Sequence, residues 1–250
     1  MRISPATFCS LILAAAAAGA DTLSDLKAVV EPLRGATPIH AIVEIQRARK
    51  SEGRFANQTS NGSVTVDVSS DEAGLHLTYA PSLLERAERE ARDHEADPKK
   101  PTPIRSTIAD IDANGMADDL DFRSPLLRLL GVATTIGEAR VMYHGTPARL
   151  LVLKLAPHLP REATTIWHVN FSEDRLNVWI GTDGVPIAAE RSRKGSAGFL
   201  FLRGEMTSHE SWNFVHADDH LVVLRHESSF IGTGFGQRGE GRDLQTVTLR

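Results

Sequence analysis

An aspartate-rich segment carries the sharpest chemical pattern in the chain. Residues 110–121 read DIDANGMADDLD, with Gly115 at position six and oxygen-bearing side chains at positions one, three, five, nine and twelve: Asp110, Asp112, Asn114, Asp118 and Asp121. This spacing is typical of an EF-hand calcium loop, in which glycine permits a sharp turn and the oxygens converge on the ion. The last position of such a loop is normally a longer glutamate. The segment therefore predicts either a weak calcium site, with no other cofactor expected, or a solvated loop, because aspartate-rich turns also form for local reasons.

A second group of candidate metal ligands lies in residues 216–220, which read HADDH. Two histidines four residues apart with carboxylates between them suit a transition metal, and a metal-dependent hydrolase would use His216, Asp218 and His220. The flanking residues alternate as strands do, so we expect the histidines at the two ends of a hairpin turn. A hydrolase is therefore kept as an alternative, and the first expectation is a protein that is not an enzyme.

Residues 234–239 read GFGQRG and match the G-x-G-x-x-G spacing of dinucleotide-binding loops. Such a loop has to be followed by a crossover helix and a second parallel strand, and only residues 240–250 follow this one. We therefore expect no dinucleotide binding. The glycines predict a mobile hairpin loop over residues 232–241 instead.

The composition argues against several classes of protein. The chain has 28 Lys+Arg and 32 Asp+Glu, for a formal net charge of −4, and lacks a basic block, so we expect no nucleic-acid partner. The single cysteine, Cys9, lies within the first twenty residues, which argues against disulfides and zinc–cysteine sites. Neither G-x-S-x-G nor H-E-x-x-H is present.

The first twenty residues predict a secretory signal peptide. Arg2 precedes an apolar run over residues 8–18, and the small residues at 18–20 suit cleavage after Ala20. The run is too short for a membrane span, since crossing a hydrocarbon core of about 30 Å takes roughly 20 residues. We therefore expect an exported, periplasmic protein that does not span the membrane, with residues 21–250 forming a single domain.

Hydrophobic periodicity beyond residue 20 predicts many strands and a few helices. An amphipathic helix is expected from Thr22 to about Gly35, and a helical, acidic insert at about 81–131 opens at Pro81 and ends in a short apolar helix over residues 124–131. Turns are expected at residues 61–62 and 71–74. Strands are predicted at residues 39–45, 64–68, 75–79, 138–144, 148–155, 164–171, 175–181, 185–192, 198–206, 220–229 and 243–249.

This order of elements, together with residues 176–186, which read LNVWIGTDGVP, resembles the lipoprotein-carrier-like superfamily of periplasmic lipoprotein-sorting proteins, where a "v-W-i-d-x-x-G-x-P" run is common. The resemblance implies an α+β, mainly antiparallel β fold: a curved open half-barrel sheet with helices packed on the concave face. It also implies a non-catalytic binding or carrier protein. Its ligand would be an apolar or acylated small molecule or a lipoprotein.

Two strand faces and one helix are the candidate lining of such a pocket. A concave sheet would gather their apolar side chains, and the helix over residues 124–131 would cover them. The alternative is ordinary core packing, because any half-buried sheet has alternating apolar faces. A third interpretation is a calcium-stabilised protein that binds a partner in the cell envelope. The candidate ligand-binding residues are Leu126, Leu127, Leu130, Trp167, Val169, Phe171, Leu176, Val178 and Ile180.

Overall fold

The structure, a computed structural model, describes residues 14–53, 57–156, 168–199, 202–234 and 236–250. In these ranges ten antiparallel strands form one sheet in the order β3-β2-β1-β10-β9-β8-β7-β6-β5-β4. The two edge strands, β3 and β4, do not pair with each other, so the curved sheet stays open. The predicted fold class is confirmed.

The bounds of the elements follow from hydrophobic alternation in the strands and from apolar stripes in the helices. The strands are β1 (Ile39–Gly53), β2 (Gln58–Asp71), β3 (Gly74–Tyr79), β4 (Ala133–Tyr143), β5 (Thr146–Leu155), β6 (His168–Ile180), β7 (Pro186–Phe199), β8 (Leu202–Ala217), β9 (His220–Gly234) and β10 (Gln237–Leu249). The helices are α1 (Ala14–Val30), α2 (Pro81–Ala96), α3 (Pro103–Ala109), α4 (Ala113–Leu120) and α5 (Arg123–Gly131).

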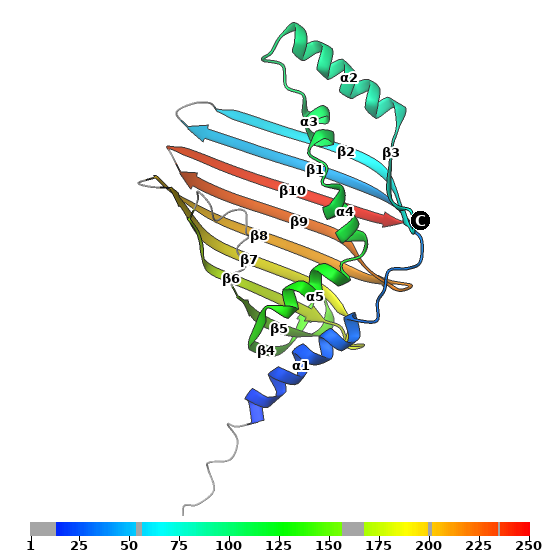
Figure 1. The fold of residues 1–250 in the computed structure, drawn as a ribbon, viewed down its shortest axis with the longest axis vertical. Helices are drawn as coiled ribbons and strands as arrows, with labels where there is room; N and C mark the ends of the chain where they lie inside the picture. The colour runs from blue at the N-terminus through cyan, green and yellow to red at the C-terminus, as the bar shows by residue number, and fades with distance from the viewer. Residues whose placement is uncertain (1–13, 54–56, 157–167, 200–201, 235) are drawn as a thin grey trace, which may run out of the picture.

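The helical insert connects the two edges of the sheet. Strands β3 and β4 are consecutive in the sequence but lie at opposite edges, so α2 to α5 have to cross the whole concave face between them. Figure 1 shows α3, α4 and α5 crossing the sheet obliquely, with α1 beside α5. The insert begins at Pro81 and ends at Gly131, as its sequence pattern predicts.

Two apolar clusters join the helices to the sheet. In the first, Leu126 and Leu130 of α5 are fully buried against β5 and β6. In the second, Met116 and Leu120 of α4 pack on the valines of β1 and β2. The expected position of the apolar helix over the sheet is therefore confirmed, and packing on the sheet stabilises helices too short to persist alone.

Several predicted turns are in fact parts of strands. Asn61 and Gly62 belong to β2, and Gly62 is needed because a Cβ there would lie 2.0 Å from Thr107 Oγ1 of α3. The predicted loop at residues 232–241 is also wrong, since β9 and β10 pair up to Gly234 and Gln237. Gly62 allows α3 to approach β2 closely. The glycines of the β9–β10 hairpin do not interrupt the pairing of its two strands.

Many strands, such as β1 and β10, extend further than predicted, and two other predicted strands differ more strongly from the structure. Residues 164–171 and 175–181 were expected as separate strands, but 168–180 form the single strand β6, with residues 164–167 outside the described ranges. The register shifts between Phe171 and Glu173, so Ser172 is the extra residue of a bulge. Likewise the predicted strand over residues 198–206 is replaced by β8, which runs from 202 to 217. Its many polar residues stay in the strand because they pair with residues of β7 on one side and β9 on the other.

The helices also differ from the prediction in extent. Helix α1 starts at Ala14 and ends at Val30, so Thr22 lies inside the helix instead of capping it. Its hydroxyl donates to Glu138 Oε2 of β4 at 2.8 Å. Helices α3 and α4 fill a segment that was expected to be an acidic loop. Within the described ranges, no helix has both the length and the apolar character that crossing a bilayer requires.

Asp219 ties the β8–β9 turn to the connection between α1 and β1. Its carboxylate accepts hydrogen bonds from Ala36 N at 2.7 Å and Thr37 N at 3.2 Å, and these bonds hold the pKa of Asp219 at about 2. A lowered carboxyl pKa stabilises the fold above the ordinary value of 3.8, and this contribution is lost as the pH falls toward 2.

We expect Asp219→Asn to lower the unfolding temperature at pH 7, with a difference from the wild type that shrinks between about pH 4 and pH 2. Thermal unfolding at a series of pH values measures it. Asp218→Asn is the matched control, because Asp218 lies in the same turn, is exposed, and has a positive φ of 53° that asparagine tolerates. A difference of constant size down to pH 2 would contradict the assignment.

Candidate functional site

The concave face has a part that the helices cover and a part that they leave open. In Figure 1 the ends of β1 and β9 project beyond the helices. Cross-strand neighbours share a face, so the open part carries the row Arg47, Asp243, Ser228, Glu210 and Arg191. The part of the concave face that the helices leave open is therefore charged, and its side chains are half-buried, whereas the part that they cover is apolar.

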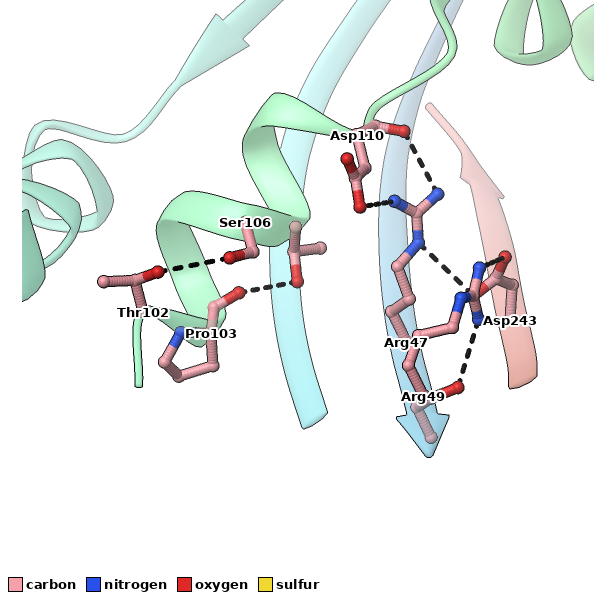
Figure 2. Close-up of polar contacts among 9 residues, drawn as sticks. Arg47, Arg49, Thr102, Pro103, Ser106, Asp110 and Asp243 are labelled. Atoms are coloured by element: carbon pink, nitrogen blue, oxygen red, sulfur yellow. Dashed lines mark hydrogen bonds and ion pairs between the residues drawn. The ribbon is translucent and has the colours of Figure 1, made fainter. Parts of the chain in front are cut away.

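Figure 2 shows how one end of this charged row is neutralised. Arg49 binds Asp243 through two hydrogen bonds of 2.6 Å. Arg47 lies 3.3 Å from Asp243 and 3.0 Å from the carboxylate of Asp110, and it also donates to the Asp110 carbonyl at 3.1 Å. This cluster ties the end of α3 to β1 and β10.

The other end of the row is also paired. Arg191 donates to both oxygens of Asp174 at 2.8 and 2.6 Å, and Arg193 forms an ion pair with Glu210. Asp174 is buried, and a buried carboxylate needs an opposite charge beside it, which the guanidinium of Arg191 provides. Each of these four arginines, Arg47, Arg49, Arg191 and Arg193, therefore has a carboxylate of its own chain within reach.

Asp119 holds α4 to the sheet. Its Oδ2 accepts hydrogen bonds from His226 Nδ1 at 2.9 Å and Gln245 Nε2 at 2.7 Å, and its residue is only 4% exposed. Burial raises the pKa of Asp119. Burial alone would lower the pKa of His226, but the hydrogen bond and charge of Asp119 outweigh it, so the pKa of His226 is raised. A cavity of about 250 Å³ lies beside this group, between α4 and Arg47.

A larger cavity, of about 680 Å³, lies near the β4 edge of the sheet, where the β4–β5 hairpin meets the β6–β7 turn. We call it the hairpin cavity. Its lining combines apolar side chains, two arginines and a hydroxyl, including Met142, Pro147, Ile180, Arg140, Arg149 and Thr182. Met142 is 64% exposed. An open apolar surface with a few polar groups is the usual composition of a site for a small molecule.

The hairpin register determines which side chains of β4 and β5 face this cavity. His144 and Gly145 have φ values of 48° and 83° and form a two-residue turn that pairs Tyr143 with Thr146. Arg140 is consequently opposite Arg149, and Arg149 is opposite Ile180. Ile180 belongs to the apolar core, so both arginines lie on the concave face at the edge of that core.

Most of the predicted ligand-binding residues are packed together in the first apolar cluster. Leu126, Leu130, Leu176, Val178 and Ile180 are fully buried there, and Leu127 is partly buried at its edge. Phe171 shares their face because the bulge at Ser172 restores the alternation. Trp167 and the side chain of Val169 lie outside the described part of the chain. Among the residues of this set whose side chains the structure describes, only Ile180 lines the hairpin cavity.

The five predicted calcium ligands do not converge. Asp110 pairs with Arg47, Asp112 caps α4 by accepting from Asn114 N at 3.0 Å, and Asp118 pairs with Arg128 at 3.2 Å. Asp121 packs against Gly35 and His220, and burial raises its pKa. In the described ranges, no three His, Cys, Asp or Glu side chains are grouped as metal ligands. Helix α4 separates these oxygens, and calcium binding stays an untested prediction.

The histidines of residues 216–220 lie at the two ends of the β8–β9 hairpin, as predicted. Ala217 pairs with His220 and His216 pairs with Leu221, so the two imidazoles lie on opposite faces of the sheet. His220 is buried, and its Nε2 lies 2.6 Å from the carbonyl oxygen of Thr37, whereas His216 is exposed. The geometry does not bring them together around one ion, and it does not favour the hydrolase alternative.

Comparison with models of known protein families gives no match, and a search of curated proteins finds no relative of this chain.

Proposed function

We propose that the protein is an exported, periplasmic binding or carrier protein that holds an apolar or acylated ligand without transforming it. The hairpin cavity is the observation that supports this proposal best. Its volume of about 680 Å³ falls within the range of roughly 300–1,000 Å³ that is usual for small-molecule sites. Met142 and Pro147 offer it apolar surface from one hairpin.

The exposure of Met142 supports an apolar occupant. A methionine side chain that is 64% exposed leaves apolar surface in water, and covering such surface contributes about 25 cal/mol per Å². Methionine also adapts its shape to different partners, because it is unbranched and has three rotatable bonds. The export part of the proposal rests on the composition of residues 1–20, with Arg2 before an apolar run and small residues at the expected cleavage point.

A fluorescence titration tests the proposal. N-phenyl-1-naphthylamine, an uncharged apolar fluorophore, should bind the wild type saturably. Met142→Gln should weaken this binding about tenfold or more, since a buried methionine contributes roughly 1.5–3 kcal/mol and 1.4 kcal/mol is a factor of ten.

Ile136→Gln is the matched control, because Ile136 is another exposed apolar residue of β4, at 51%, and it does not line the cavity. It should leave the affinity unchanged. Absence of saturable binding, or an equal loss in both variants, would contradict the assignment of the hairpin cavity.

A further inference from the structure

We infer that the ligand of the hairpin cavity carries an anionic head group, a carboxylate or a phosphate, which Arg140 and Arg149 bind. This inference rests on the proposed function and adds the chemistry that selects among apolar ligands. It comes from the charges that line the cavity, whereas the proposed function comes from its apolar surface.

The two arginines are directly opposite each other in the β4–β5 ladder. Side chains in such a pair have Cβ atoms about 4.5–5.5 Å apart, and like charges at this distance destabilise the sheet. Both arginines line the same cavity, beside the buried Ile180. The fold therefore brings two positive charges together at the edge of its core.

The protein itself neutralises this pair only in part. Arg149 lies 3.8 Å from Glu138 and 3.5 Å from the hydroxyl of Thr22, and Glu138 also accepts the Thr22 hydroxyl at 2.8 Å. Arg140 has no ion-pair partner among the residues that the structure describes. The pair is therefore left with an excess of positive charge.

The other arginines of the concave face show that this arrangement is not general. Arg49 has two hydrogen bonds of 2.6 Å to Asp243, and Arg191 has bonds of 2.8 and 2.6 Å to Asp174. Elsewhere on this face the sequence places a carboxylate beside each arginine of the charged row. At the hairpin cavity an external anion would take that place.

The chemistry of the lining fits an amphipathic acid. A guanidinium offers two parallel N–H groups that match the oxygens of a carboxylate or phosphate. Thr182 adds a hydroxyl, and Met142 and Pro147 provide the apolar surface for a hydrocarbon chain. One end of the ligand would neutralise the arginines while the other covers the exposed apolar surface.

Competition against the bound fluorophore tests the inference with three probes: dodecanoate, dodecanol and inorganic phosphate. Dodecanoate should bind the wild type about tenfold more tightly than dodecanol, because a hydrogen bond to a charged group contributes roughly one factor of ten or more. Arg140→Ala should remove this difference and leave dodecanol unaffected. Arg92→Ala, on the exposed face of α2, should behave as the wild type.

Each outcome separates the two proposals. If the fluorophore does not bind, the proposed function fails. If it binds and dodecanoate and dodecanol compete equally in the wild type, this inference alone is overturned. If inorganic phosphate competes as well as dodecanoate does, the anion is a free ion and the head-group assignment is wrong.

A stability measurement guards against misfolding of the variant. Without ligand, Arg140→Ala should raise the unfolding temperature by about 1–3 °C, since it relieves a like-charge cross-strand pair. Dodecanoate should then raise the unfolding temperature of the wild type more than that of the variant. A lower unfolding temperature for the ligand-free variant would show that Arg140 is structural, and would contradict the inference.

Discussion

Replacing Asp119 by alanine should lower the free energy of unfolding by about 3–5 kcal/mol, the usual effect of removing one partner of a buried charged pair. Asp119 is 4% exposed, and its loss leaves His226 and Gln245 without the acceptor that both of them use. Helix α4 would also lose its main polar attachment to β9 and β10. Urea unfolding followed by circular dichroism measures this change.

Asp118→Ala is the matched control, since it removes the neighbouring aspartate of the same helix. The side chain of Asp118 is 46% exposed and lies 3.2 Å from Arg128, and an ion pair that water reaches in this way contributes at most about 1 kcal/mol. We therefore expect a loss of less than 1 kcal/mol for this variant. Equal losses in the two variants would contradict the assignment of Asp119 as the residue that holds α4.

Leu130→Asp should lower the free energy of unfolding by at least about 4 kcal/mol. Leu130 is fully buried between α5 and the sheet, and truncation of a buried leucine alone removes about 2–5 kcal/mol. Aspartate adds the penalty of placing a carboxylate in an apolar environment. Because the folded state of such a domain is stable by only about 5–15 kcal/mol, Leu130→Ala is the fallback if the aspartate variant does not fold.

The control for this substitution is Leu84→Asp on α2, where the leucine is 43% exposed. Its effect should stay below about 1 kcal/mol, because surface substitutions away from special features have small effects. If Leu130→Asp is as mild as Leu84→Asp, α5 is a loosely held lid and not part of the core.

The sequence predicted the elements whose patterns are local. Alternating apolar residues identified most strands, and proline at residue 81 marked the start of α2. The β8–β9 turn was also predicted, because His216 and His220 flank a polar pair between two alternating segments. These features depend on neighbours within a few residues, and the sequence displays such neighbours directly.

The errors arose where distant segments decide the structure. Gly62 makes room for α3, a helix more than forty residues further along the chain. The sequence pattern predicts a turn there, because asparagine–glycine pairs usually form turns. Ser172 falls between two predicted strands, but the bulge keeps β6 continuous, and Asp174 pairs with Arg191 of β7. Spacing alone could not show that a polar residue has a partner on another strand.

The candidate site was missed because it depends on register. The connection after β4 was expected at residues 145–147, but the turn consists of His144 and Gly145. A change of one or two residues in the turn alters every cross-strand pair, so the opposition of Arg140 and Arg149 could not be seen in the sequence. Similarly, the spacing of the aspartates did not show that Asp119 alone would be buried.

A native mass spectrum of the protein purified from its own host tests the central claim most directly. We predict a species whose mass exceeds that of the polypeptide by one amphipathic acid, and we expect this species to be lost in Arg140→Ala. The control Arg92→Ala should retain it. A wild-type spectrum with the mass of the polypeptide alone, under conditions that preserve non-covalent complexes, would contradict the assignment of the protein as a carrier of such a ligand.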